Sequence, residues 1–563
     1  MDRNSARPNI LLFMFIGAFI LLVLRLFYIQ VIRHSFYKDL SSDQRLRAVE
    51  LLPDRGDIFD RKGNLLATSV KKWSVYVRPR AIANRKEILA LLIKADGQNE
   101  KLIREKFASG GNFWLRRKAE KEFAEKIAKI GTAGIDITPE KKRIYPKGRL
   151  AAQLVGFAGL DNKGLSGMEL ALEKHLLGKP GRYVFERDPA GREIFSAVSR
   201  QINAAEDGMN VFLTIDEPIQ YFVQRELESA VRDSGAIAGS VIVMDIKNGD
   251  VLAIAGWPDF DPNEYSKFPP SIWRLSPVTD IYEPGSTFKM ITACAGMDEG
   301  LFVPESVIPS PEELKVGGIT VKNSHPLKMD RPFKDLTDVI AESLNTGTAH
   351  VGIKLGRDKL YSYIKKFGFG SYTGVGFPGE QPGMLFAPSR WRESDLATIS
   401  FGQTLAVTPL QLVSAISAIA NGGVRMKPRL VRRIESPDGS IVRSEPEQQF
   451  GSVISKATAR KANELMKAVA YKQRGTGHKA RINGFSVAVK TGTAQKPVPG
   501  KGYVKGKYIA SIVGYAPASD PRIAVLVVVD EPKESIWGAT VAAPVFKNVA
   551  EFSLRSLNVA PDL

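Results

Sequence analysis

The N-terminal segment constrains this chain more than any other feature. An uncharged apolar run extends from Ile10 to Leu24, and beyond Arg25 the residues LFYIQVI continue it to Ile32. At about 1.5 Å per residue, a helix over 10–32 is roughly 34 Å long, enough to cross a bilayer. Arg25 lies toward one end of that helix, where an arginine side chain can reach the interface. Since no small-x-small cleavage site follows, the sequence predicts an uncleaved single-pass anchor and not a signal peptide.

The remaining chain is long enough for more than one folded domain. It has 563 residues in total, 44% hydrophobic and 25% charged, and no second stretch approaches membrane length. The polar stretch NAAEDGMN (203–210) is the predicted domain boundary. We therefore expect a short tail (1–9), the anchor (10–32), a mixed first domain (33–205) and a second domain (206–563).

Charge and cysteine content exclude several functions. The formal net charge is +19, but the basic residues are spread along the chain and form no tail or aromatic-interleaved patch, so no nucleic-acid partner is predicted. An anionic membrane surface, an anionic polymer or simply a basic solvated surface fits this charge. The single cysteine, Cys294, excludes an intrachain disulfide and is expected to be a buried core residue. The five histidines show no ligand spacing, so no metal site is predicted.

Periodicity predicts the class of the second domain. The strand patterns NVFLTID and GSVIVMDIKNGDVLAIAG, the latter a hairpin, open it, and FSVAVKTG, YIASIVGYAP and RIAVLVVVDEP close it. Helical patterns such as DVIAESLNTGTAHVGIKLG and TPLQLVSAISAIANGG lie between. This order favours a mixed α/β domain whose sheet joins distant segments. In the first domain, SFYKDLSSDQRLRAVE, KEILALLIKA and RRKAEKEFAEKIAKI are predicted to be helical.

A serine and a lysine lie three positions apart in IYEPGSTFKM (281–290). Pro284-Gly285 predicts a turn, and Ser286 then begins a helix on which Lys289 shares its face. Because Ser-x-x-Lys also occurs elsewhere in the chain, for example at Ser35/Lys38 and Ser69/Lys72, the pair alone does not identify a catalytic site.

Two further motifs follow in a meaningful order. ESLNTG contains Ser343-Leu344-Asn345 within a predicted helix, and VKTGTA contains Lys490 to Thr493 at the end of a predicted strand. The motifs S-x-x-K, S-x-N and K-T-G in this order are the signature of penicillin-binding proteins and class A β-lactamases. Together they indicate that the first pair is catalytic.

Acyl-transfer chemistry explains the residue types in the first two motifs. The Ser286 hydroxyl needs a base, and Lys289 can serve if burial and the nearby charge of Lys490 lower its pKa. Ser343 can relay protons between that base and a leaving amine, and Asn345 can hold the amide of an acyl donor.

The K-T-G strand suits a substrate carboxylate. Thr491 and Thr493 offer hydroxyls, Lys490 adds positive charge, and Gly492 leaves room for a substrate backbone. The backbone N–H groups of Ser286 and Thr493 are the expected oxyanion hole.

With these motifs the chain resembles the class B penicillin-binding proteins, specifically the division-specific septal peptidoglycan D,D-transpeptidases. The likeness covers nearly the whole chain. In the first domain it includes RGDIFDRKGNLLA (55–67), the stretch from Arg143 to Gly181, and ERDPAGREI (186–194). In the second it includes EPGSTFK, FGQTLAVTPLQL, RGTGHKA, KTGTAQKP and VAAPVF.

The resemblance implies an elongated α+β pedestal domain (33–205) that carries an extracytoplasmic transpeptidase domain (206–563) of the penicillin-binding/serine β-lactamase-like fold. It implies that the N-terminus is cytoplasmic, the catalytic domain periplasmic, and no cofactor is needed. Ser286 would attack stem peptides of nascent peptidoglycan ending in D-Ala-D-Ala, release D-alanine and pass the acyl group to a neighbouring amine. β-Lactams would acylate the same serine. The implied partners are a membrane-embedded septal glycan polymerase and other divisome proteins.

Some subtypes and rival functions stay open. Asn345 favours the septal type, because elongation-type relatives usually have aspartate there, whereas Leu344 departs from the usual serine or cysteine. The short C-terminal end after VAAPVF leads us to expect a Gram-negative owner. The alternatives are an elongation-type transpeptidase, a D,D-carboxypeptidase or β-lactamase, a β-lactam sensor, and an inactive scaffold.

Overall fold

The chain divides into two compact units. The computed structural model describes residues 6–97, 99–187, 193–194, 200–325, 332–498, 500 and 502–563. Unit 1 consists of Met1–Asp54 and Gly178–Gly208, and unit 2 of Arg55–Leu177 and Met209–Leu563. The first five residues of the predicted tail and residues 188–192 of the ERDPAGREI motif lie outside the described residues.

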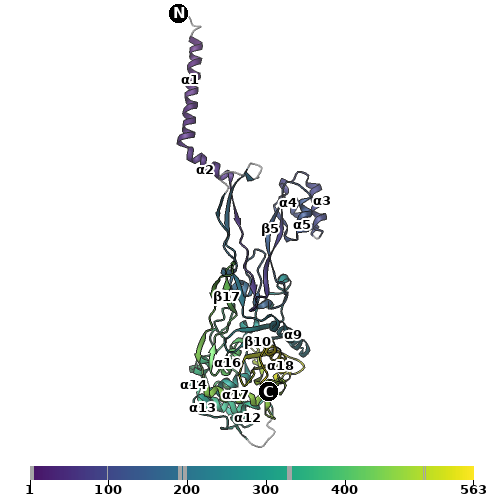
Figure 1. Ribbon diagram of the computed structural model, residues 1–563, viewed down its shortest axis with the longest axis vertical. Coiled ribbons are helices and arrows are strands. Elements are labelled where there is room, and N and C mark those ends of the chain that lie inside the picture. The colour runs from purple at the N-terminus through teal and green to yellow at the C-terminus, as the bar shows by residue number, and fades with distance from the viewer. Residues whose placement is uncertain are drawn as a thin grey trace. The chain divides into compact units, whose positions relative to one another are not determined.

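Unit 1 contains the predicted anchor. Helix α1 (Ala6–Phe27) continues as the π-helical turn η1 (Tyr28–Ile32), and the span Pro8–Ile32 is long and apolar enough to cross a membrane (Figure 1). Helix α2 (His34–Arg45) follows. The expected helix over 35–50 therefore ends early, because its last residues pair as a strand. The strands of this sheet are β1 (Leu46–Leu51), β6 (Gly181–Arg187), β7 (Glu193–Ile194) and β8 (Arg200–Asn203).

An antiparallel-rich sheet in unit 2 connects the first and second halves of the sequence. Its long strand β3 (Leu65–Val77) pairs with β2, β4 and β5, and β2 pairs in parallel with β9. The other strands are β2 (Ile58–Phe59), β4 (Phe113–Ala119), β5 (Ile135–Ile144), β9 (Asn210–Leu213), β17 (Val431–Glu435) and β18 (Ile441–Ser444). NVFLTID thus contains the expected strand.

Three helices surround a small core near β3. They are α3 (Arg85–Asp96), α4 (Glu100–Ser109) and α5 (Lys121–Ala128), and their apolar side chains pack with Val75 and Val77. The prediction of α3 is confirmed, but the helix predicted over 116–130 is only half right. Residues 116–119 belong to β4, because pairing with β3 outweighs the helix propensity of this charged stretch.

A second large sheet of unit 2, with five strands, joins segments far apart in the sequence, as predicted. Its antiparallel order is β11-β10-β22-β21-β20, and Ala238 of β10 lies opposite Asp530 of β22. The predicted hairpin and the three C-terminal strands are all present. Their bounds are β10 (Ala238–Asp245), β11 (Val251–Trp257), β20 (Ala488–Val498), β21 (Gly502–Ala516) and β22 (Ile523–Asp530).

Helices cover both faces of this sheet (Figure 1). A Cβ on Gly239 would lie 2.7 Å from Leu227 of α9, whereas the next residue, Ser240, lies 3.2 Å from Ser276 of α10 (Oγ to Oγ). Because successive strand residues point to opposite faces, α9 and α10 are on opposite sides. On the first side, α9 (Glu217–Ser234) packs with α18 (Gly538–Ser556), and on the other, α10 (Ser276–Thr279) packs with α16 (Pro409–Ala420).

Three short helices, α6 (Ala152–Val155), α7 (Gly167–Ala171) and α8 (Glu173–Leu176), lie between β5 and β6 in the chain. The remaining helices of unit 2 lie around the α16 side. They are α11 (Lys289–Asp298), α12 (Leu336–Ala341), α13 (Asn345–Leu355), α14 (Arg357–Lys366), α15 (Glu393–Ser400) and α17 (Lys456–Tyr471). The helix predicted from TPLQLVSAISAIANGG is confirmed as α16. Thr408 caps it, since its hydroxyl accepts from the Gln411 N–H while the Gln411 side chain accepts from the Thr408 N–H.

A buried carboxylate joins two of the sequence motifs of the first domain, 55–67 and 143–181. Glu169 is fully buried, and its oxygens lie 2.6 Å from Nε of Arg55 and 2.6 Å from Nε of Arg143. The Tyr145 hydroxyl lies 3.2 Å from the same carboxylate. Both arginines are also nearly fully buried. The network fixes RGDIFDRKGNLLA against the stretch that begins at Arg143.

Candidate active site

The nucleophile segment starts at a tight turn. Gly285 has φ +54° and begins the 3₁₀ turn η5 (Gly285–Phe288), which leads directly into α11. A Cβ at Gly285 would lie 2.9 Å from the Cβ of Ala494, so only glycine allows this close approach to β20. Ser286 is half-buried, and its hydroxyl makes no hydrogen bond to any described residue.

Two buried lysines meet at the hydroxyl of Ser343. Lys490 Nζ donates to Ser343 Oγ at 2.8 Å and to the Thr491 carbonyl at 2.9 Å. Lys289 Nζ donates to the Ser343 carbonyl at 2.6 Å and lies 3.3 Å from Ser343 Oγ. Both lysines are fully buried. No carboxylate forms an ion pair with either of them in the part of the chain that the structure describes.

Burial controls the protonation of both amines. It lowers the pKa of Lys490 to about 7. Burial, together with the positive charge of Lys490, holds the pKa of Lys289 well below its ordinary value. An amine that is neutral near pH 7 and donates two hydrogen bonds keeps its lone pair free to accept a proton.

The Ser-x-Asn motif interrupts a helix instead of lying inside one. The predicted helix over 338–356 is split, since α12 ends at Ala341, α13 begins at Asn345, and Ser343 has φ +59°. This conformation directs both oxygens of Ser343 to the lysines. Leu344 is fully buried. Asn345 Nδ2 donates to the Lys322 carbonyl at 2.8 Å, which leaves its side-chain oxygen without a partner among the described residues.

The K-T-G residues lie in β20, as predicted. Thr491 Oγ1 is 2.7 Å from Thr476 Oγ1, and Thr493 Oγ1 accepts from the Gly538 N–H at 3.2 Å. A Cβ at Gly492 would lie 2.4 Å from Ser511 Oγ. Glycine is therefore required at position 492 because a neighbouring strand packs against it. The sequence had suggested a different reason for this glycine, namely room for a substrate backbone.

Sequence reasoning missed several residues that shape the site. Asn323 Oδ1 accepts from the N–H of Asn345 at 2.8 Å, and Thr476, from RGTGHKA, contacts both Thr491 and the Ala341 carbonyl. Of these residues, only Thr476 lies in a motif that the sequence analysis had identified, RGTGHKA. Cys294 is a buried core residue as expected, and burial raises the pKa of its thiol.

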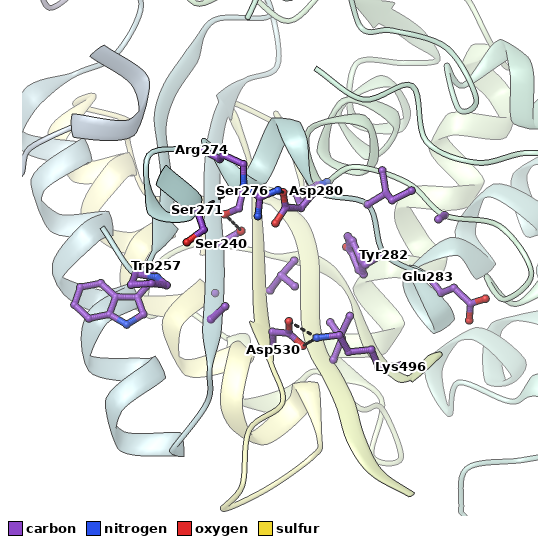
Figure 2. Close-up of a pocket in the computed structure, with 18 of the residues that line it drawn as sticks. Ser240, Trp257, Ser271, Arg274, Ser276, Asp280, Tyr282, Glu283, Lys496 and Asp530 are labelled. Carbon is purple, nitrogen blue, oxygen red and sulfur yellow. Dashed lines mark hydrogen bonds and ion pairs between the residues drawn. The ribbon is translucent and has the colours of Figure 1, made fainter. Parts of the chain in front are cut away.

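A pocket of about 510 Å³ lies beside the nucleophile segment (Figure 2). It runs along the α10 side of the large sheet, from Trp257 on β11 to Glu283, three residues before Ser286. Lys496 Nζ lies 2.7 Å from Asp530 on its floor. None of the predicted catalytic side chains lines this pocket, so it adjoins the catalytic cluster without containing it.

Comparison with known families agrees with this site. The description "Penicillin binding protein transpeptidase domain" matches residues 239–551, and "Penicillin-binding Protein dimerisation domain" matches residues 50–213. The chain belongs to the class B penicillin-binding proteins. Within that class it is a peptidoglycan D,D-transpeptidase, and the mixed α/β transpeptidase fold with a pedestal is confirmed.

Individual relatives match over almost the full length. Stage V sporulation protein D of Bacillus subtilis is 34% identical, covering 100% of this chain and 88% of that protein. Peptidoglycan D,D-transpeptidase FtsI of Escherichia coli is 32% identical, covering 96% and 90%. The crystal structure of penicillin binding protein 3 from Mycobacterium tuberculosis with ampicillin has 29% identity and a TM-score of 0.71, covering 91% and 97%.

Proposed function

We propose that this transpeptidase crosslinks peptidoglycan of the division septum, with Ser286 as its nucleophile. The observation that carries the catalytic proposal is the convergence of Lys289 and Lys490, both fully buried, on Ser343. Asn345 supports the septal type, by the difference from elongation-type relatives noted above. The proposed partners are the ones that the family resemblance implies, a membrane-embedded septal glycan polymerase and other divisome proteins.

Acylation needs one proton transfer in each direction. Ser286 Oγ attacks the carbonyl carbon of the penultimate D-alanine, and its proton passes to the neutral amine of Lys289. The C–N bond then breaks, and Ser343, polarised by Lys490 at 2.8 Å, delivers its proton to the departing amine and regains one from the Lys289 ammonium at 3.3 Å, which returns Lys289 to the neutral amine. D-Alanine leaves, and Ser286 carries the acyl group as an ester.

Deacylation reverses the steps of acylation, with the amine of a neighbouring stem peptide in place of the D-alanine amine. The acceptor nitrogen attacks the ester carbonyl, a C–N bond forms, and the bond to Ser286 Oγ breaks. The proton lost by the acceptor amine passes through Ser343 and Lys289 to that oxygen. During acylation Thr491 and Thr493 hold the carboxylate of the terminal D-alanine. In both half-reactions Asn345 Oδ1 holds the donor amide, and the N–H groups of Ser286 and Thr493 stabilise the oxyanion.

The domain assignments follow the same proposal. A cytoplasmic tail (1–9) precedes the anchor (10–32), the pedestal (33–205) and the transpeptidase domain (206–563), which is extracytoplasmic. The helix over Pro8–Ile32 supports the anchor. β-Lactams would acylate Ser286, and the ampicillin complex of the mycobacterial relative supports this.

Covalent labelling tests the nucleophile. The full chain in detergent is incubated with a fluorescent penicillin beside Ser286→Ala, and the adduct is measured by intact mass. We expect a stable adduct that the variant lacks. An adduct that turns over rapidly would instead identify a hydrolase, and labelling of Ser286→Ala would remove Ser286 from the mechanism.

The septal role is tested in the source bacterium. A fluorescent fusion should collect at the division site, and depletion should give filaments. Uniform side-wall fluorescence with rounded cells on depletion would identify the elongation type.

A further inference from the structure

A carboxylate three residues before the nucleophile has no part in the mechanism above. Glu283, at one end of the pocket in Figure 2, is only 9% exposed, and burial raises the pKa of its carboxyl group. No lysine or arginine forms an ion pair with it in the part of the chain that the structure describes. Because burying a carboxylate without a cation costs free energy, its hydrogen-bond partners indicate why it is there.

Glu283 accepts hydrogen bonds from two other segments. The Thr404 N–H donates to Oε1 at 3.1 Å, and the Tyr503 hydroxyl lies 2.9 Å from Oε2 and 3.2 Å from Oε1. Thr404 belongs to the motif FGQTLAVTPLQL, and Tyr503 is the second residue of β21. One carboxylate therefore links the segment that leads to Ser286 with residues 121 and 220 positions away in the sequence.

Backbone contacts already fix the nucleophile turn to the first of these segments. The Gly285 N–H donates to the Gly402 carbonyl at 2.9 Å, and Tyr282 and Val407 exchange two hydrogen bonds of 3.0 and 2.9 Å. A Cβ on Gly402 would lie 2.2 Å from the Gly285 carbonyl oxygen, so the two backbones touch at this point. The hydrogen bond from Thr404 therefore adds to a connection that exists without it.

The connection to the hairpin of β20 and β21 depends on Glu283 to a greater extent. Among the described residues, the bond from Tyr503 is the one hydrogen bond that joins the segment 281–288 to this hairpin. The other contacts are packing contacts, such as the approach of Gly285 to Ala494. Packing alone resists compression, whereas a hydrogen bond to a charged group also fixes direction and distance.

This connection is important because the proposed oxyanion hole is divided between the same two elements. Its donors are the N–H groups of Ser286, on η5, and of Thr493, on β20. Both have to lie within about 2.7–3.1 Å of the developing negative charge to stabilise it. Tyr503 pairs with Pro497 in the hairpin that carries Thr493. Its bond to Glu283 therefore restricts the movement of one donor relative to the other.

We propose that Glu283 is a positioning residue of the acyl transfer, and that its hydrogen bond from Tyr503 holds the two halves of the oxyanion hole together. In this role Glu283 contacts no reacting atom and acts through the backbone of residues 284–286. The inference rests on the proposed function, with Ser286 and Thr493 as the oxyanion donors. It assigns the bond to the tetrahedral intermediate and not to the first, non-covalent complex.

The test measures the two steps of penicillin acylation separately. Stopped-flow experiments on the full chain in detergent with a fluorescent penicillin give the Kd of the non-covalent complex and the rate constant of acylation. For Tyr503→Phe we expect the rate constant to fall by about 5- to 50-fold, because a displaced donor stabilises the oxyanion less. The Kd should change by less than about twofold. An acylamidomethyl boronic acid, which forms a tetrahedral anionic adduct with a serine, should lose affinity by the same factor as the rate constant.

Three further variants separate positioning from a general loss of structure. Glu283→Ala should slow acylation at least as much as Tyr503→Phe, and adding the second change to the first should have no further effect. Glu283→Gln can still accept from Thr404 and donate to Tyr503, so it should keep most of the wild-type rate. Tyr508→Phe removes another hydroxyl of β21, which lies 3.4 Å from Gln495 Nε2, and should match the wild type.

The outcomes that contradict the proposal are distinct from those that contradict the proposed function. Additive effects of Glu283→Ala and Tyr503→Phe, an unchanged acylation rate in Tyr503→Phe, or a loss confined to the Kd would overturn the positioning role. Unchanged affinity for the boronic acid in a slow variant would also overturn it. Failure of the wild-type chain to form a penicillin adduct would instead refute the acyl-enzyme mechanism.

Discussion

Lys490 should make the folded protein less stable at neutral pH even though we propose that catalysis depends on it. Its pKa falls from the ordinary 10.5 to about 7 in the folded state because the amine is buried. In the unfolded chain the amine keeps its proton up to about pH 10.5, so between these values the unfolded state binds more protons. Stability therefore rises with pH through this window and is lowest below pH 7. Replacing Lys490 with methionine, which has a similar length, removes this cost.

The size of the effect follows from the two pKa values. A difference of about 3.5 pKa units corresponds to about 5 kcal/mol of destabilisation at pH 6, of which about 4 kcal/mol is recovered by pH 10. Lys490→Met also loses the hydrogen bonds to Ser343 and Thr491, worth together about 1–3 kcal/mol. The variant should therefore be about 2–4 kcal/mol more stable at pH 6 and slightly less stable than the wild type at pH 10.

The assay is denaturant unfolding of the full chain in detergent at both pH values, with penicillin acylation measured in parallel. Acylation by Lys490→Met should fall by about tenfold or more, since Ser343 loses its cationic donor. Lys490→Arg, which keeps a charge, should not gain stability at pH 6. If Lys490→Met shows the same pH dependence of stability as the wild type, then the amine does not titrate in this window and the reasoning is wrong.

Two further predictions concern packing. Glu169→Ala removes the buried carboxylate that Arg55 and Arg143 share, leaving Arg55 with Glu173 at 2.7 Å and Arg143 with only a 3.9 Å contact to Asp57. It should lower the free energy of unfolding by about 3–5 kcal/mol, measured by urea denaturation, and an unchanged midpoint would contradict the network's role. Gly492→Ala places a Cβ 2.4 Å from Ser511 Oγ and should slow penicillin acylation by about 5- to 100-fold through a displaced β20, with partial recovery in the double variant carrying Ser511→Gly. Absence of recovery would assign the defect to another contact.

Much of the fold could be predicted because local patterns and tertiary structure agree. The hairpin β10–β11, the three C-terminal strands and α16 all have strong periodicity and matching turn or capping residues. The exceptions arose where pairing partners lie far away in sequence. Residues 116–119 are charged and favour a helix locally, but they complete a sheet with β3.

Within the candidate site, the residue types could be predicted and the backbone at Ser343 could not. Nothing in ESLNTG marks a break, because serine is not a usual left-handed residue and no glycine or proline flanks it. The φ of +59° is maintained by contacts from three distant segments. Lys289 holds the Ser343 carbonyl, Lys490 holds its hydroxyl, and Asn323 holds the N–H of Asn345.

The same long-range origin applies to the lysine pKa values. A Ser-x-x-Lys pair on an isolated helix would leave its amine in water, protonated at neutral pH, and unable to act as a base. The pKa of Lys289 falls well below its ordinary value because α11 buries the amine and because β20 brings a second buried amine, Lys490, to the same hydroxyl. The three motifs therefore have no catalytic meaning one at a time. Their chemistry exists only once the sheet has joined residues about two hundred positions apart, which is why the motif order predicted the site better than any single motif.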